Sequence, residues 1–290
     1  MQLKKRVPRQ RKINRTRAGN IVIFMLIIIY GLFMALPLVY AVSNSLKPLD
    51  ELWAFPPRFF VQNPTLKNFR DLVNITEDGW VPFSRYVLNT VIVAVVGTGG
   101  HLVLSSMCAY VLAKHDFPGK NLMFKTVVVS LMFSTAVTAV PSYIIIAKLR
   151  LIDTLSSIIL PAFGASLGLY LMKQFMETGV PDSLLEAARI DGSSEWHTFW
   201  HVVMPLVKPA WLTLIIFSFQ GLWNTGTTTY IQSEQIKTLN YALSQIVNAG
   251  VARQGTAAAA TIVMMLVPIV MFVISQSNIV ETVASSGMKD

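Results

Sequence analysis

Two histidines, His197 and His201, are the residues whose types and spacing most directly suggest chemistry. They lie four positions apart, so on a helix they would share one face and could hold a metal ion. In the zinc-protease pattern H-E-x-x-H a glutamate follows the first histidine, whereas Thr198 occupies that position here. We therefore expect no metal site and interpret the pair as the polar face of a helix.

No other pattern in the chain predicts catalysis. The phosphate-binding pattern G-x-x-x-x-G-K-[ST] does not occur, so we expect no nucleotide site in this chain. No nucleophile, base and orienting acid combine into a convincing catalytic set. The single cysteine, Cys108, builds neither a disulfide framework nor a zinc site and is interpreted as a packing residue. We predict that the protein is not an enzyme and has no cofactor of its own.

The most informative stretch, residues 181–205, has the pattern of two short helices joined by a tight turn. Ser183, with Glu186 three residues later, fits a capping box at the start of the first helix. Gly192 fits the left-handed position that ends this helix, because glycine has no Cβ to clash there. Ser193 or Ser194 can cap the second helix. The second helix has an apolar stripe that consists of Trp196, Phe199, Trp200 and Val203.

Composition places this stretch in a membrane protein. Of the 290 residues, 53% are hydrophobic and 13% are charged, and the mean hydropathy is +0.54. A soluble domain carries about 25% charged residues. Six stretches reach the roughly 20 apolar residues that a membrane-spanning helix needs. They cover 21–43, 86–113, 122–147, 155–176, 206–229 and 255–277. We predict an all-α membrane protein with six transmembrane helices.

Basic residues predict the orientation in the membrane. Eight of the 24 lysines and arginines fall within the first 20 residues, and the positive-inside rule places such a segment in the cytoplasm. No aromatic residue stands among them to stack on bases, so we expect no nucleic-acid partner. Six spans place both termini in the cytoplasm. The expected parts are a basic N-terminus (1–20), the first span (21–43), an external loop (44–85), a core of five spans (86–277) with a cytoplasmic loop (177–205), and a tail (278–290).

The order Glu186-Ala187-Ala188-x-x-Asp191-Gly192, followed by Phe199, Pro205 and Pro209, resembles the EAA loop of permease subunits of binding-protein-dependent ABC importers. The carbohydrate branch, of the maltose-transporter inner-membrane type, is the most similar. The resemblance implies a cytoplasmic coupling helix between the fourth and fifth spans, which docks on a separate ATPase subunit through Glu186 and Arg189. The residues carried over to this role are Glu186, Ala187, Ala188, Arg189, Asp191 and Gly192.

The same resemblance implies the partners and the location. The partners are a second permease subunit of different sequence, a dimer of ATPase subunits that binds ATP and Mg²⁺, an external or periplasmic solute-binding protein, and membrane lipid. The location is the inner membrane of a bacterial cell. The expected solute is a sugar or an oligosaccharide, acidic ones included, because residues 225–229 and 276–290 depart from the common family pattern. The outer loop 230–254 is expected to face the solute-binding protein.

Polar and aromatic side chains within the predicted spans are candidates for the solute path, because sugars present hydroxyls and apolar C–H faces. These candidates are Asn89, Thr135, Thr138, Gln220, Trp223 and Asn224. Interhelical hydrogen bonding is the alternative role for each of them. Two other functions stay open, an ion- or proton-coupled secondary transporter and a scaffold that transports nothing. The secondary transporter is disfavoured, because such carriers usually have buried ionisable residues. His101 is the only ionisable side chain near the middle of a predicted span, tyrosine and cysteine aside.

Overall fold

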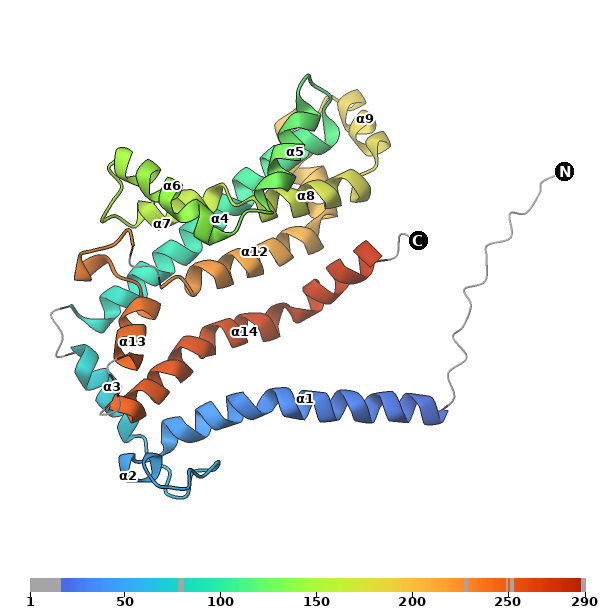
Figure 1. Ribbon diagram of the computed structural model, residues 1–290. Helices are drawn as coiled ribbons and strands as arrows, with labels where there is room; N and C mark the ends of the chain where they lie inside the picture. Colours follow the sequence, from blue (N-terminus) through green and yellow to red (C-terminus); the bar gives the residue numbers. More distant parts are fainter. Residues whose placement is uncertain (1–16, 78–80, 227–228, 249, 251–252, 288–290) are drawn as a thin grey trace.

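The regular structure of the chain is helical throughout the part that the computed structural model describes, which comprises residues 17–77, 81–226, 229–248, 250 and 253–287 (Figure 1). No strand occurs within these ranges, and the predicted all-α class is confirmed. The elements are α1 (Arg17–Leu46), α2 (Leu49–Leu52), α3 (Lys67–Glu77), α4 (Phe83–Lys114), α5 (Lys120–Ser130), α6 (Thr135–Lys148), α7 (Ser156–Phe163), α8 (Ser166–Gly179), α9 (Asp182–Ile190), α10 (Glu195–Thr198), the π-helix η1 (Phe199–Val203), α11 (Met204–Leu206), α12 (Lys208–Trp223), the 3₁₀ helix η2 (Glu234–Ile236), α13 (Leu239–Val247) and α14 (Gln254–Gly287).

Four helical stretches in the described ranges are long and apolar enough to cross a membrane. They cover Ala18–Leu46, Phe83–Lys114, Ser156–Gly179 and Gln254–Ser275, of which the third comprises α7 and α8. A fifth candidate is the pair Glu195–Leu206 and Lys208–Trp223, whose two parts are bent by 84°. The structure therefore shows a multi-pass helical protein with four or five candidate spans, and these correspond to the predicted spans other than 122–147.

The predicted span 122–147 is not one continuous helix. It is divided into α5 and α6, and residues 131–134 separate the two. The hydroxyl of Ser134 accepts a hydrogen bond from the N–H of Ala136 at 3.2 Å and so caps the start of α6. Pro141, inside α6, lacks an N–H and weakens the helix further. The prediction of an unbroken helix is wrong here, because a polar cap lies inside the apolar run.

The central helix is α4, and its two ends pack in separate apolar clusters. One cluster joins α4 to α13, α14 and the end of α12, and its most deeply buried members are Val93, Ala94, Leu243, Ala259 and Ala260. The other joins the opposite end of α4 to α8, α9, η1 and α12, and includes Met172, Met176, Leu185, Val203 and Leu214. In Figure 1, α9 lies at one end of the long helices, while α3 and α13 lie at the other.

Helix α1 stands apart from this arrangement. None of the residues in its most apolar window is buried by the rest of the described chain. In Figure 1 it diverges from the body of the molecule along most of its length and approaches α14 near one end. The apolar surface of α1 is therefore left for lipid or for another subunit to cover.

Candidate functional site

The predicted coupling segment folds as a helix, a turn and a second helix that bends into α12. Helix α9 ends at Ile190, and Gly192 in the following turn has φ +78°. The N–H of Ser193 donates to the carbonyl of Ala188 at 2.9 Å. Ser194 caps α10, since its hydroxyl accepts a hydrogen bond from the N–H of His197 at 3.3 Å. The left-handed turn at Gly192 and the cap at Ser194 are confirmed.

The start of α9 differs from the prediction. The helix begins at Asp182 after Pro181, whose ring offers no side-chain cap. The capping box predicted from Ser183 and Glu186 is therefore wrong. Instead, Lys114 at the end of α4 holds the helix start from outside, with Nζ 2.8 Å from Oδ1 of Asp182. This hydrogen bond and the charge of Lys114 hold the pKa of Asp182 below its ordinary value.

A single apolar residue anchors α9 to the body of the protein. Leu185 is 4% exposed and packs in the cluster that also contains Met176 and Phe199, whereas the neighbouring Leu184 is 42% exposed. Of the predicted coupling residues, Ala188 is half-buried, and the exposed ones are Glu186, Ala187, Arg189, Asp191 and Gly192. Helix α9 therefore holds Leu185 inside, while its small and charged residues, together with Leu184 and Ile190, face outward.

Glu195, which the sequence pattern does not single out, joins the coupling segment to α4. Its Oε2 accepts a hydrogen bond from the hydroxyl of Tyr110 at 2.7 Å. Its Oε1 accepts two from the guanidinium of Arg189, at 3.1 and 3.0 Å, and Nε2 of His115 lies 3.6 Å from the carboxylate. Arg189, predicted to contact an ATPase, thus has a partner within the chain. The only sequence signal for Glu195 is its place after Ser194, and acidic residues are common in the first turn of any helix.

The histidine pair lies on the exposed face of this segment. The rings of His197 and His201 stack with centroids 3.9 Å apart. Within the described residues, no group of three or more His, Cys, Asp and Glu side chains could hold a metal ion. On the opposite face Phe199 and Val203 are buried as expected, whereas Trp196 is 60% exposed. The predicted apolar stripe therefore packs on the core only from Phe199 onward.

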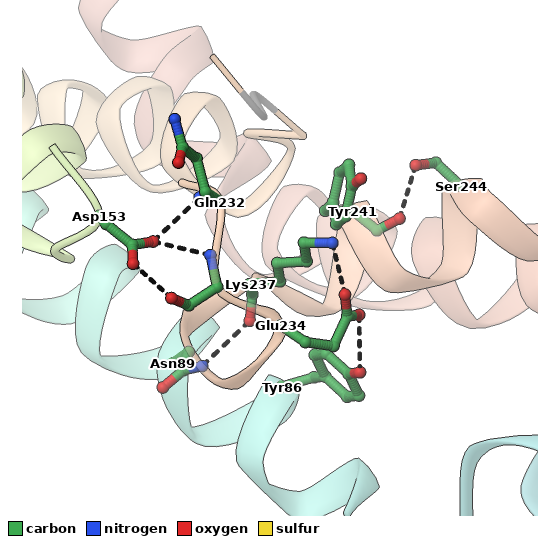
Figure 2. A network of polar contacts seen from close by, with 9 residues as sticks. Tyr86, Asn89, Asp153, Gln232, Glu234, Lys237, Tyr241 and Ser244 are labelled. Carbon is green, nitrogen blue, oxygen red and sulfur yellow. Dashed lines mark hydrogen bonds and ion pairs between the residues drawn. The ribbon is translucent and has the colours of Figure 1, made fainter. Parts of the chain in front are cut away.

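At the other end of α4, the loop between α12 and α13 is tied down by polar contacts (Figure 2). The amide of Asn89, which is buried, donates to the carbonyls of Gln235 at 2.9 Å and Lys237 at 3.0 Å. The hydroxyl of Tyr86 donates to Oε1 of Glu234 at 3.0 Å. Asn89, a candidate for the solute path, therefore holds this loop in the structure.

Asp153 holds the same loop from the connection between α6 and α7. Its carboxylate accepts hydrogen bonds from the N–H groups of Gln232 at 2.9 Å and Ser233 at 2.8 Å, and from the Ser233 hydroxyl (Figure 2). These bonds, that of the hydroxyl first, lower the pKa of Asp153, so the charged form that binds the loop is favoured. Behind the loop, the apolar stripe of α13 faces the core, and its members are Leu239, Leu243 and Ile246. Residues 232–235 of this loop are exposed.

The remaining candidates for the solute path are divided between helices. Trp223 is buried near the end of α12, where Gln220 is partly buried and the C-cap residue Asn224 is exposed. Thr138 is exposed on α6. Thr135 begins α6, but its side chain lies outside the part that the structure describes. A role in the solute path stays a prediction for all of them.

The family described as "Binding-protein-dependent transport system inner membrane component" matches residues 16–284. The chain belongs to this family. It is thus a permease subunit of an ABC importer, and ATP hydrolysis belongs to a separate ATPase. The resemblance to permease subunits of binding-protein-dependent ABC importers is confirmed.

Several characterised permeases are similar to this one. It is 30% identical over 201 residues to the diacetylchitobiose uptake system permease protein NgcG of Streptomyces coelicolor, covering 69% of this chain and 64% of that protein. It is 29% identical over 265 residues to the arabinooligosaccharides transport system permease protein AraQ of Halalkalibacterium halodurans, covering 87% and 90%. It is 31% identical over 217 residues to the sn-glycerol-3-phosphate transport system permease protein UgpE of Yersinia pestis, covering 73% and 75%.

A solved structure has the same fold. It is a chain of a bacterial ABC transporter involved in the import of the acidic polysaccharide alginate, with a TM-score of 0.78 and 20% sequence identity. The match covers 91% of the permease and 98% of that chain. The similarity extends over nearly the whole length, so the helices of this chain are arranged as in that transporter chain.

In the permease, the hydrogen bond between Tyr110 and Glu195 should matter more than the pair between Arg189 and Glu195. A hydrogen bond to a charged group contributes about 1.5–3 kcal/mol. The Arg189 pair is half exposed, and such pairs contribute about 0–1 kcal/mol. We expect Tyr110→Phe to lower ATP-driven uptake about tenfold, because the segment loses one of its ties to α4, that between Tyr110 and Glu195. Arg189→Ala should lower it about twofold or less.

A double-mutant cycle with Glu195→Ala tests this expectation. Uptake by the double variant Tyr110→Phe/Glu195→Ala should be no lower than uptake by Glu195→Ala alone, since both changes remove one interaction. Additive losses would show that the two residues act separately. A loss for Arg189→Ala as large as that for Tyr110→Phe would show that Arg189 has a further partner outside the chain.

Proposed function

We propose that this permease forms one half of the transport channel of an importer for a sugar or an oligosaccharide. In this proposal it crosses the bacterial inner membrane six times, with the broken pair α5–α6 as the third span and α7–α8 as the fourth. Both termini and α9 then lie in the cytoplasm. The observation that carries the proposal is the coupling segment itself, in which a Gly192 turn and the Glu195 contacts make a stiff connection from α9 to α4 and α12.

The partners in this proposal follow from the surfaces that the chain leaves uncovered. A second permease subunit of different sequence, together with lipid, covers the apolar surface of α1. A dimer of ATPase subunits, which binds ATP and Mg²⁺, receives the exposed face of α9. A solute-binding protein docks on the opposite end, where residues 232–235 are exposed on a loop braced by Asn89 and Asp153. Closure of the ATPase dimer then shifts the channel between inward- and outward-facing states.

The names of the relatives support a saccharide. Two are named for oligosaccharides, the third is named for a glycerol phosphate, and the solved structure belongs to an importer of an acidic polysaccharide. Solutes rich in hydroxyl groups are common to all of them. We infer an oligosaccharide, with neutral and acidic members as the two classes to compare.

Reconstitution with the partner subunits tests the proposal. The complex, in proteoliposomes with the solute-binding protein, should hydrolyse ATP faster when an oligosaccharide is added, and uptake should require ATP. Chitobiose, arabinotriose, an alginate trisaccharide and glycerol 3-phosphate form the test panel, and thiamine is a control solute of unrelated chemistry. Uptake by the permease from an ion gradient alone, without the ATPase, would instead establish a secondary transporter. No response to any saccharide would overturn the solute class.

A further inference from the structure

His101 is a buried polar residue that the coupling segment and the outer loop do not use. It lies on α4 and is 4% exposed. Its Nε2 is 3.0 Å from the carbonyl oxygen of Ala165, and its Nδ1 is 3.0 Å from Oγ of Ser218 on α12. One imidazole therefore contacts three parts of the chain, which are α4, α12 and the junction between α7 and α8.

The chemistry of these contacts fixes the direction of both hydrogen bonds in the neutral ring. A carbonyl oxygen can only accept, so Nε2 of His101 must carry the proton and donate to Ala165. The unprotonated Nδ1 then accepts a hydrogen bond from the hydroxyl of Ser218. Both ring nitrogens are thereby satisfied, as a polar group inside a membrane protein requires.

The junction that His101 holds is a break inside a candidate span. Gly164 and Ala165 separate α7 from α8, and Ala165 is extended, with ψ 117°. Together the two helices form the spanning stretch Ser156–Gly179. Breaks of this kind occur at membrane depth where the backbone is held by other parts of the protein, and they are places where a helix can bend.

Two glycines let α4 approach this junction closely. A Cβ at Gly168 would lie 2.3 Å from Nε2 of His101, and a Cβ at Gly100 would lie 2.1 Å from Cε1 of Phe163. Small residues at helix contacts allow such an approach in membrane proteins. The imidazole therefore lies directly against the backbone at Gly168, with the Leu214 side chain close to the same position, and has little room to move.

We propose that His101 is a positioning residue for transport, which locks the α7–α8 junction to α12. Because α12 continues through α11, η1 and α10 to the Gly192 turn, movement of the coupling segment is passed through Ser218 and His101 to the junction. This inference rests on the proposed alternation of the channel between two states. That the imidazole of His101 holds the α7–α8 junction does not depend on the proposed function.

In this proposal His101 holds the junction through its hydrogen bonds and not through its size, and substitutions can distinguish these two causes. His101→Leu fills similar space without donating or accepting. His101→Gln keeps an amide N–H near the position of Nε2 and can still donate to Ala165. Ser218→Ala removes one of the two contacts with almost no change in volume. A residue that only fills space would tolerate leucine at least as well as glutamine.

Hydrogen–deuterium exchange on the full complex in nanodiscs measures the lock directly. In His101→Leu, the amides of residues 162–168 should exchange about three- to tenfold faster than in the wild type, as the loss of one or two interhelical hydrogen bonds predicts. Exchange in His101→Gln should stay within about twofold of the wild type, and Ser218→Ala should fall between them. Unchanged exchange in His101→Leu would overturn the lock.

ATP-driven uptake by the same variants measures the role in transport. His101→Leu should lose most uptake while the complex still assembles and hydrolyses ATP, and His101→Gln should retain most of it. Faster exchange with normal uptake in His101→Leu would overturn the positioning role. If the wild-type complex itself failed to import under ATP, the proposed function would fall, while the exchange data would still decide whether His101 holds the junction.

Discussion

Replacing Gly192 with valine should lower ATP-driven uptake at least tenfold while leaving the protein in the membrane. Gly192 has φ +78°, and a Cβ placed there would meet no atom within 4 Å. The cost of a side chain at Gly192 therefore comes from the backbone conformation and not from a steric clash with other atoms. The left-handed region costs an L-residue about 1–2 kcal/mol, and a β-branched side chain is a marked outlier there. The turn between α9 and α10 would relax and aim α9 away from its partner.

Two further variants separate this cause from a general effect of valine. Gly192→Asn should retain most uptake, because asparagine tolerates the left-handed region. Gly179→Val is the matched control, since Gly179 also has open space around it but an ordinary φ. Uptake is measured per amount of permease in the membrane. Normal transport by Gly192→Val would mean that the direction of α9 does not matter for coupling.

The features of this site that depend only on residues adjacent in the sequence could be predicted from the sequence. The turn at Gly192 and the cap at Ser194 are set by glycine's freedom at positive φ and by a hydroxyl close to a free N–H. Four of the six predicted spans, or five if the bent pair is one span, also correspond to candidate membrane-spanning helices, because length and apolarity are local properties. Local chemistry therefore suffices to predict the helix, turn and second helix of residues 181–205.

Contacts over long sequence distances could not be predicted in this way. Glu195 meets Tyr110 across 85 positions, and Asn89 meets Gln235 across 146. Neither pair has a spacing that one helix would reveal. The capping box at Ser183 failed for the same reason, because Lys114, from another helix, holds the start of α9. The break in the predicted span 122–147 is marked by the polar cap at Ser134. Hydropathy averaged over a window of about 20 residues does not reveal a single polar residue of this kind.

Leu185 is the residue on which the mechanical connection of α9 most depends. Truncation of a buried leucine to alanine typically costs about 2–5 kcal/mol, whereas a hydrogen bond to a charged group contributes about 1.5–3 kcal/mol. Leu185 is 4% exposed and packs among residues of α8, η1 and α12. Without it α9 could still bind an ATPase through its exposed face, but its movement would be passed to α12 less effectively. ATP hydrolysis would then continue without import.

Leu185→Ala is therefore expected to raise the number of ATP molecules hydrolysed per solute imported at least tenfold. Leu184→Ala is the matched control, because it removes the same atoms from the next position, which is 42% exposed, and it should change this ratio less than twofold. Leu185→Met, which keeps the volume, should restore most coupling. Both rates are measured on the reconstituted complex. An equal effect of the two alanine variants would mean that α9 acts through its outer face alone, because burial is the main difference between the two leucines.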